Sequence, residues 1–345
     1  MKAKILTGLL EGAIIALSTV GLVSCDAIYE EIEQCPVEIR FVYDYNMEWA
    51  NAFHNQVDCL TVYFYDEDGN FVLKESVNDA RRLADESFRL YPVLDAGKYH
   101  VVAYGGMECN QSSFSLIDEP AKGSHYTDLH VKLDDACLTV KERLRLHNHF
   151  YGALDFTVDN VNPTYATVPM MRNTNSIQIA LQHVDGSPID VNDFVFEIFD
   201  DNNDFDCDNN LLPTGEIKYT PWNTENRSTG LVDGRAGEEW AAALAQFTTS
   251  RLVYTKDTPT KTTPTTLRVS KVEDGEVVFE IPLVNYMLMF KDGNVTNPSG
   301  NSISKQEYLD RENRWNFVFF LDNNLWVSTH IVINDWDVRI NEANW

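Results

Sequence analysis

Apolar side chains recur at every second position in several stretches of this chain, which is the spacing of half-buried β-strands. In the first stretch, Glu38 and Arg40 alternate with apolar residues. The stretches that show this alternation are Val37–Tyr43, Ile177–Leu181, Phe194–Ile198, Val277–Ile281, Phe317–Leu321 and Thr329–Ile333. The pattern predicts an all-β protein.

Short polar segments separate these stretches. Asp66–Asn70 and Glu273–Glu276 each contain one Gly, which can supply the positive φ that a tight hairpin turn requires. Helical signals are few, and the clearest is the capping-box pattern of Ser304–Glu307, which predicts one or two helical turns through Arg311. The segment Thr255–Thr266, rich in Thr, Pro and Lys, predicts a long exposed loop.

The strands are numerous enough for two domains. The chain has 345 residues, and a hydrophobic content of 44% can fill two cores. Many short strands joined by Gly, Asn and Asp turns are typical of β-sandwiches. The best candidate linker is Asp159–Thr164, so we expect two sandwich domains in tandem, at 36–160 and 165–345.

The beginning of the chain has the pattern of an export signal. Two lysines precede an apolar stretch over residues 5–23, which is too short and interrupted for a membrane span. The stretch ends in Leu22-Val23-Ser24-Cys25, a lipobox in which the Cys25 thiol forms a thioether to diacylglycerol. We expect a signal peptide at 1–24 and a lipidated acidic tether at 25–35. An ordinary signal peptide with a chance cysteine is the alternative.

The negative charge of the chain limits the classes of partner that it can bind. The tether carries Asp26, Glu30, Glu31 and Glu33, and this acidic run resembles the signal that places some Gram-negative lipoproteins on the outer face of the outer membrane. The whole chain has a formal net charge of −26 and no cluster of Lys or Arg. Such a surface repels nucleic acid and anionic lipid headgroups. We therefore expect a surface-exposed lipoprotein of the cell outer membrane and no nucleic-acid partner.

Five cysteines remain once Cys25 is lipidated, and the odd number leaves at least one thiol free or paired between molecules. Export permits disulfides, but the spacing shows no Cys-x-x-Cys zinc or redox pattern. We expect buried free thiols for most of the five, which are Cys35, Cys59, Cys109, Cys137 and Cys207.

Two features suggest metal ligands. His147 and His149 would lie on one face of a strand and could offer two nitrogens to zinc, although His125 and His130 supply no fitting third ligand. The segment 200–210 is dense in oxygen ligands suited to calcium, but it lacks the sixth-position Gly and the terminal Glu of an EF-hand loop. Ordinary strand histidines and a solvated turn are the simpler interpretations, so we expect no metal and no cofactor.

Motifs for catalysis do not appear in the sequence. It contains no nucleophile elbow, P-loop, Rossmann fingerprint or His-Glu-x-x-His motif. Gly105-Gly106 could let the backbone approach a ligand closely, although a tight turn between strands is the simpler interpretation. We therefore do not expect an enzyme.

Several short motifs follow one another in a recognisable order. They are Cys35–Met47, Val62–Gly69, Leu94–Tyr99 with Val101–Gly106, Arg172–Asn175, Ile281–Leu283, Gln306–Arg311 and Ile331–Trp336. Together with the lipobox, they resemble the FimB-type anchor and accessory lipoproteins of type V pili, the Bacteroidales-type fimbriae built from fimbrillin lipoprotein precursors. The resemblance implies two transthyretin-like β-sandwich domains in tandem.

The resemblance also implies a mechanism. Pilin members lose their first strand to an arginine-specific protease, and the C-terminal strand of the next subunit fills the vacated groove by β-strand addition. An anchor member keeps its own first strand, so its groove stays closed, while its lipid holds the fimbria to the membrane.

Arginine positions favour the anchor role. Arg40 lies inside the first strand, Arg81-Arg82 is expected on a helix or loop, and no arginine follows that strand in an obvious exposed linker. We expect an uncleaved anchor at the base of the fimbrium that contacts shaft subunits through the last strand and the tail 337–345. The predicted contact residues are Trp326, Ile331, Ile333 and Trp336.

Two other functions stay open. One is a glycan-binding surface lipoprotein or a fimbrial tip adhesin, for which exposed aromatic residues around Trp222 or Trp240 would form a platform. Burial of these tryptophans would instead favour the anchor. The other is a hydrolase, which no motif supports.

Overall fold

The computed structural model describes residues 35–229, 240–256, 261, 263–289, 291, 295–323, 325–333 and 336–341. The predicted signal peptide, Cys25 and all of the tether except Cys35 lie outside these residues. The chain from Pro36 onward forms one compact unit.

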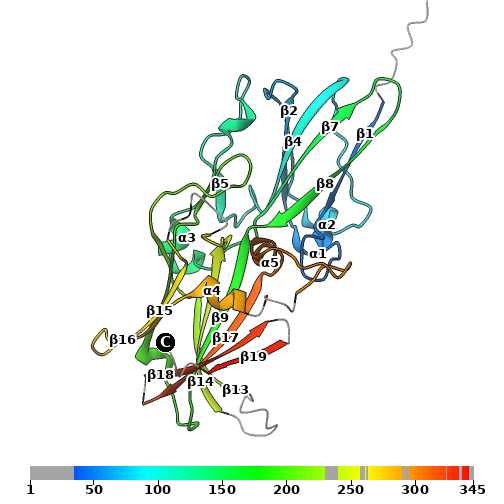
Figure 1. Cartoon of the computed structure of the whole chain (residues 1–345). Helices are drawn as coiled ribbons and strands as arrows, with labels where there is room; N and C mark the ends of the chain where they lie inside the picture. The colour runs from blue at the N-terminus through cyan, green and yellow to red at the C-terminus, as the bar shows by residue number, and fades with distance from the viewer. Residues whose placement is uncertain are drawn as a thin grey trace, which may run out of the picture. The chain divides into compact units, whose positions relative to one another are not determined.

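The described chain is dominated by β-strands, so the all-β prediction is confirmed (Figure 1). The strands are β1 Val37–Val42, β2 Leu60–Asp66, β3 Phe71–Val77, β4 Gly97–Gly105, β5 Phe114–Leu116, β6 Val131–Leu133, β7 Phe150–Val158, β8 Thr164–Arg172, β9 Thr174–His183, β10 Phe194–Asp200, β11 Asp204–Phe205, β12 Ile217–Tyr219, β13 Asn223–Thr229, β14 Trp240–Ser250, β15 Thr266–Lys271, β16 Val277–Pro282, β17 Arg314–Asp322, β18 Leu325–Ile333 and β19 Trp336–Asn341.

Helices are short. They are α1 Phe53–Gln56, α2 Ala80–Leu83, α3 Ala136–Thr139, α4 Leu283–Met289 and α5 Lys305–Arg311, with 3-10 turns η1 Tyr126–Asp128, η2 Lys141–Arg143 and η3 Val191–Asp193. Within the described ranges, none has the length and apolar character that crossing a membrane requires.

The first large sheet has the strand order β1-β8-β7-β4-β2-β3. β1 runs parallel to β8, from Val37 opposite Thr164 to Val42 opposite Pro169, and the other pairs are antiparallel. The predicted linker, Asp159–Thr164, is therefore largely the turn between two strands of one sheet. Residues 165–172 belong to this first sheet, because β8 pairs with β1 and β7.

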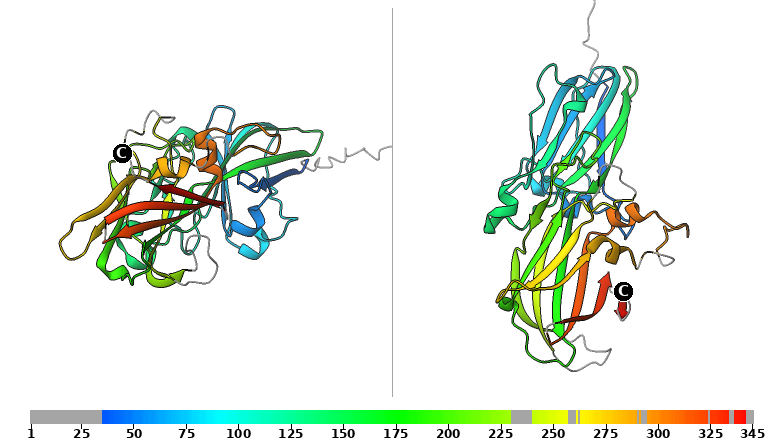
Figure 2. Two further views of the ribbon diagram at one scale, coloured as in Figure 1. Left: turned by 60° about the horizontal axis from the view of Figure 1, so that its bottom comes forward. Right: turned by 60° about the vertical axis from the view of Figure 1, so that its left-hand side comes forward.

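The chain after Arg172 forms a second six-stranded sheet, β13-β14-β9-β17-β18-β19, and a four-stranded sheet, β12-β10-β15-β16. β9 and β17 are parallel neighbours, which requires a long connection between them. In a small sheet, β11 pairs with β6 of the N-terminal half. Figure 2 shows these strands from two further directions.

The sheets pack around two large hydrophobic cores. One lies between one face of the first sheet and the helices α1 and α2, and its members include Phe41, Phe53 and Val101. The other is continuous from Tyr104 on the first sheet to Phe317 on the second. One uninterrupted core therefore links the two large sheets.

The predicted hairpins and helix are confirmed. The turn between β2 and β3 contains Gly69 at φ +81°, and the turn between β15 and β16 contains Gly275 at φ +74°. Ser304 caps α5, because its hydroxyl accepts a hydrogen bond from the Glu307 backbone N–H at 3.0 Å. Helix α4 carries no comparable sequence signal, since it is a run of mostly buried apolar residues without a polar face.

Gly106 allows a close approach between two segments of this chain. Its φ is +83°, and a Cβ at this position would lie 1.8 Å from the carbonyl oxygen of Asn148. The loop after β4 can therefore reach the segment before β7 only because residue 106 has no side chain.

Replacing Gly106 with Ala is expected to lower the free energy of unfolding roughly twice as much as replacing Gly123. Both glycines have positive φ, which costs about 1–2 kcal/mol for Ala, but a Cβ at Gly123 would meet nothing within 4 Å. Only Gly106→Ala adds a clash with backbone. Urea denaturation measures both losses, and equal losses would contradict the role of the close approach.

Candidate functional site

The first strand is a strand of the N-terminal sheet whose inner side chains are buried. The inward side chains of β1, Val37, Ile39 and Phe41, are at most 3% exposed, and Tyr43 just after the strand is fully buried. The ring of Phe41 stacks on that of Phe53 with centroids 5.7 Å apart. Burial of four such side chains contributes roughly 6–12 kcal/mol of transfer free energy. β1 is therefore an integral part of the core.

Backbone hydrogen bonds hold β1 on both sides. On one side it pairs with β8 along its whole length. On the other, the N–H of Ile39 donates to the carbonyl of Leu90 at 2.9 Å, and the N–H of Leu90 donates back at 3.0 Å. A strand from another molecule would have to displace β1 or Leu90 to pair here.

A residue of the C-terminal half holds the chain that follows β1. The guanidinium of Arg311, at the end of α5, donates to the backbone carbonyls of Asp44 and Asn46 at 3.3 and 3.4 Å. It also lies over the rings of Tyr45 and Trp49, 4.1 and 3.5 Å from their centroids. Arg311 thereby clamps a segment that lies 267 residues away in sequence.

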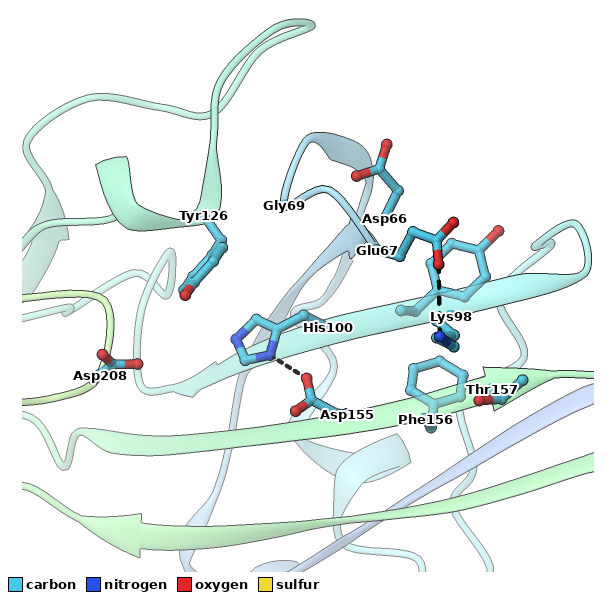
Figure 3. A pocket seen from close by; sticks show the side chains of 11 residues that line it. Asp66, Glu67, Gly69, Lys98, His100, Tyr126, Asp155, Phe156, Thr157 and Asp208 are labelled. Carbon is cyan, nitrogen blue, oxygen red and sulfur yellow. Dashed lines mark hydrogen bonds and ion pairs between the residues drawn. The ribbon is translucent and has the colours of Figure 1, made fainter.

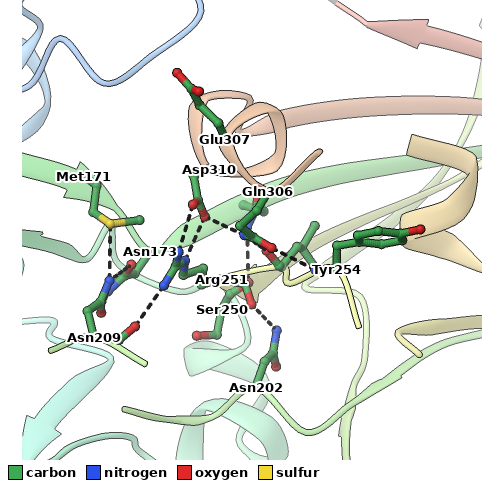
Figure 4. A network of polar contacts seen from close by, with 12 residues as sticks. Met171, Asn173, Asn202, Asn209, Ser250, Arg251, Tyr254, Gln306, Glu307 and Asp310 are labelled. Carbon is green, nitrogen blue, oxygen red and sulfur yellow. Dashed lines mark hydrogen bonds and ion pairs between the residues drawn. The ribbon is translucent and has the colours of Figure 1, made fainter. Parts of the chain in front are cut away.

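A buried polar network fixes α5 in turn (Figure 4). Arg251, directly after β14, makes a two-point ion pair with Asp310 of α5, with both contacts at 2.8 Å. Arg251 also donates to the carbonyl of Asn209 at 2.9 Å, and Gln306 donates to Asp310 at 2.9 Å. Such charge-assisted bidentate contacts are strong and directional. They set the position from which Arg311 reaches the N-terminal half.

The arginines of the N-terminal half lie in or against ordered structure. Arg40 has an exposed side chain, but its backbone lies in β1 opposite Thr167. Arg81 and Arg82 lie in α2, which agrees with the prediction of a helix or loop. Cleavage after Arg40 would therefore require β1 to separate from the sheet.

The residues predicted to contact a shaft subunit lie in the last two strands. Trp326 is half-buried in β18, and its ring packs on that of Phe279 with centroids 5.5 Å apart. Ile331 and Ile333 lie in β18, and Ile333 is the backbone partner of Trp336 in β19, the edge strand of its sheet. Trp326 thus takes part in this chain's own packing. Contact of these four residues with a partner stays a prediction.

The two histidines suggested as a zinc pair do not act together. They lie in the irregular segment before β7 and not in a strand. Nε2 of His147 is 2.9 Å from Oδ1 of Asp58, and this hydrogen bond lowers the pKa of the Asp58 carboxyl. His149 is buried and stacks on Phe114 at 4.5 Å. The suggested pairing is wrong because aromatic packing holds His149 in the core.

The acidic segment 200–210 is mostly buried, so its interpretation as a solvated turn is wrong. Asp200 and Asp201 both pair with the ammonium of Lys261, and Thr265 donates to Asp200 at 2.7 Å. Lys261 and Thr265 lie in the predicted exposed loop 255–266, but both side chains are buried. Lys261 is buried because the buried carboxylate of Asp200 needs a cation beside it.

The other carboxylates of this segment also have separate partners. Asp204 pairs with His130, one of the four histidines considered above. Asp206 accepts hydrogen bonds from the backbone N–H groups of Asp208 and Asn210 at 2.9 and 2.8 Å. In the described structure these carboxylates therefore do not form one calcium site.

A cavity of about 650 Å³ opens beside β4 and β7 (Figure 3). Its wall carries the rings of Tyr126 and Phe156 next to the carboxylates of Asp66 and Asp155, and Nδ1 of His100 is 2.7 Å from Asp155. Aromatic faces beside hydrogen-bond acceptors suit sugar rings. No pattern in the sequence indicates this site, because its residues come from separate strands and loops.

The tryptophans proposed as a glycan platform do not form one in the described residues. Trp222 is half-buried, and the guanidinium of Arg145 covers its ring at 4.7 Å. The side chain of Trp240 lies outside the description.

Cysteine chemistry is partly as predicted. Cys137 and Cys207 are buried thiols, so the expectation of buried thiols holds for two of the five cysteines and not for most of them. Cys59 and Cys109 form a disulfide across 50 residues, a pairing that spacing alone could not reveal. Cys25, the predicted lipidation site, lies outside the described residues.

Comparison with known proteins defines a class, the fimbria-associated cell-surface proteins. The model of the family described as fimbrillin-A associated anchor proteins Mfa1 and Mfa2 matches residues 32–342. The chain belongs to this family, and the resemblance seen in its motifs is confirmed. Among curated proteins, no sequence matches the chain.

Solved structures share the fold. A candidate adhesin from Bacteroides thetaiotaomicron is 45% identical, with a TM-score of 0.79 over 89% of this chain and 99% of that chain. A candidate polysaccharide-binding protein from the same species is 29% identical, with a TM-score of 0.72 over 90% and 100%. The fimbrial anchor protein Mfa2 from Porphyromonas gingivalis is 15% identical, with a TM-score of 0.61 over 89% and 99%.

Phe41→Ala is expected to lower the free energy of unfolding by about 3–5 kcal/mol, because it removes a buried ring from the core. Tyr165→Ala is the matched control, since it removes a ring that is 74% exposed from the neighbouring strand β8. Its effect should stay within about 0.5 kcal/mol. Chemical denaturation compares the two, and similar losses would show that β1 is not part of the core.

Burial lowers the pKa of His149 to about 3, below the value of about 6.5 in an unfolded chain. Between these values the unfolded state binds a proton that the folded state does not. The contribution to stability is therefore complete above pH 6.5 and is lost as the pH falls from 6.5 toward 3. His149→Phe should flatten the pH dependence of urea unfolding in this window by about 1.4 kcal/mol per pH unit. An unchanged slope would contradict the burial of a neutral imidazole.

Proposed function

We propose that this protein anchors a fimbria to the outer membrane and ends subunit addition by keeping its own first strand. The burial and two-sided pairing of β1 carry the proposal. The resemblance of the motifs to anchor and accessory lipoproteins implies that, in the pilin members, the corresponding groove is vacated and refilled by a strand from another subunit. A groove that is already filled cannot accept a further strand.

We propose that the two large sheets belong to two transthyretin-like β-sandwiches in tandem, with the boundary after Arg172. β1 completes the first sandwich from within the same chain. The second sandwich carries the C-terminal strands β18 and β19.

A lipid on Cys25 supplies the attachment to the membrane. Several acyl chains, each contributing roughly 0.8 kcal/mol per buried methylene, hold a protein stably where one chain does not. No arginine lies between Cys25 and Arg40. An arginine-specific protease therefore has no site between the lipid and β1.

The C-terminal strands supply the contact with the shaft. An edge strand presents a row of unpaired backbone N–H and C=O groups, which is what β-strand addition uses. We propose that β19 and the tail after it enter the open groove of the basal shaft subunit. Trp326, Ile331, Ile333 and Trp336 are the residues proposed to support this contact.

The experiment compares three variants in fimbriated cells and measures by electron microscopy how many fimbriae stay attached and how long they are. Cys25→Ala and deletion of residues 334–345 should each release fimbriae into the medium. Cys25→Ala removes the attachment to the membrane, so the protein itself should also be released. The deletion removes the contact with the shaft, so the protein should stay on the membrane. Attached fimbriae of normal length in both variants would contradict the proposal.

A second candidate function is glycan binding at the cavity in Figure 3, since its wall pairs aromatic rings with carboxylates. The similarity to a candidate polysaccharide-binding protein supports it. Tyr126→Ala, the third variant, distinguishes the two functions. It should leave fimbrial attachment unchanged if the protein is an anchor, whereas a loss of surface adhesion with this variant alone would favour the glycan-binding function.

A further inference from the structure

Four side chains with metal-binding atoms converge just before β2, in the loop after β4 and in the segment before β7. The ligand atoms of Asp58, Cys59, Cys109 and His147 all lie within 4.8 Å of one another. Sγ of Cys109 is 3.6 Å from Nε2 of His147 and 3.9 Å from Oδ1 of Asp58, and the last two atoms are 2.9 Å apart. The two cysteines form the disulfide described above.

We propose that these four side chains bind Zn²⁺ when the disulfide is reduced. Around a tetrahedral zinc ion, Zn–S bonds of about 2.3 Å and Zn–N bonds of about 2.0–2.1 Å put sulfur and nitrogen about 3.6 Å apart. The distance from Cys109 to His147 already equals this edge. Two thiolates, an imidazole and a carboxylate suit zinc, whereas calcium and magnesium prefer oxygen ligands alone.

Conversion of the disulfide to the zinc site requires a dithiol reductant. Its two thiols supply two electrons and two protons: the S–S bond between Cys59 and Cys109 breaks, two protein thiols form, and the reductant becomes a disulfide. Zinc then displaces both thiol protons into solvent and binds two thiolates. The two sulfurs move apart to about 3.8 Å, the S···S edge of the same tetrahedron.

The surrounding structure holds the ligands in place and leaves them accessible. Cys109 and His147 are half-buried and line a cavity of about 710 Å³, through which a reductant and an ion can reach them. The Ser113 hydroxyl accepts a hydrogen bond from the His147 backbone N–H at 2.8 Å. Gly106 lets the loop that carries Cys109 approach the segment that carries His147. Zinc would therefore preserve the cross-link between these segments after reduction.

Cobalt(II) tests the site, because thiolate ligation gives it intense charge-transfer absorption in the near ultraviolet. The mature lipoprotein in detergent is reduced with a phosphine, desalted without oxygen and titrated with Co²⁺ and then Zn²⁺. We expect one equivalent of Co²⁺ to give thiolate charge-transfer bands that Zn²⁺ abolishes. The oxidised protein should show none of these bands.

His147→Ala should weaken Co²⁺ binding at least about tenfold, and it retains the disulfide that supports folding before reduction. His125→Ala, which removes a histidine outside the cluster, is the control and should bind as the wild type does. Circular dichroism verifies that each reduced variant is folded. Absence of charge-transfer bands in the folded, reduced wild type would overturn the proposal, as would bands of equal intensity and affinity in His147→Ala.

Discussion

The packing and pairing of β1 within the first sheet is the constraint on which the rest of this structure depends. Four buried side chains and hydrogen bonds on both edges make the strand part of the first core. Removing it would expose apolar surface and leave backbone groups of β8 unpaired, both of which are costly. Core packing and backbone pairing therefore act together to hold β1 in the first sheet.

That constraint is supported from the C-terminal half. Asp310 and Arg251 hold α5, and Arg311 at the end of this helix clamps the chain that follows β1. Removing one partner of a buried ion pair leaves an uncompensated charge and commonly costs about 3–5 kcal/mol. The C-terminal half thus contacts the segment directly after β1, the strand that the anchoring proposal requires. One continuous apolar core also links the two large sheets.

Local signals in the sequence predicted local structure well. Alternation located β1, β9, β10, β16 and β17, and turn residues located both hairpins, because these features depend on neighbours in sequence. The pairing of β1 with β8 depends on residues more than a hundred positions apart. Polar residues at Asp159–Thr164 fit a linker and a hairpin turn equally well, and in the structure this segment joins β7 and β8 of one sheet.

Contacts between residues far apart in the sequence also limited the prediction of the candidate sites. His147 was recognised as a possible ligand, but its neighbours Asp58 and Cys109 come from other segments, and the sequence offered His149 instead. Lys261 was assigned to an exposed loop, since nothing in its local sequence indicates the buried Asp200 that it neutralises. The family motifs, by contrast, are spread along the whole chain in a recognisable order, and they identified the family correctly.

The most direct test of the central claim is the N-terminus of the mature protein. Mass spectrometry of the chain extracted with detergent from outer membranes of fimbriated cells measures it. The retained-strand account predicts one species that begins at acylated Cys25 and still contains residues 37–42. A mature chain that begins at Phe41, or after Arg82 or Arg89, would show that the first strand is removed and would contradict the account.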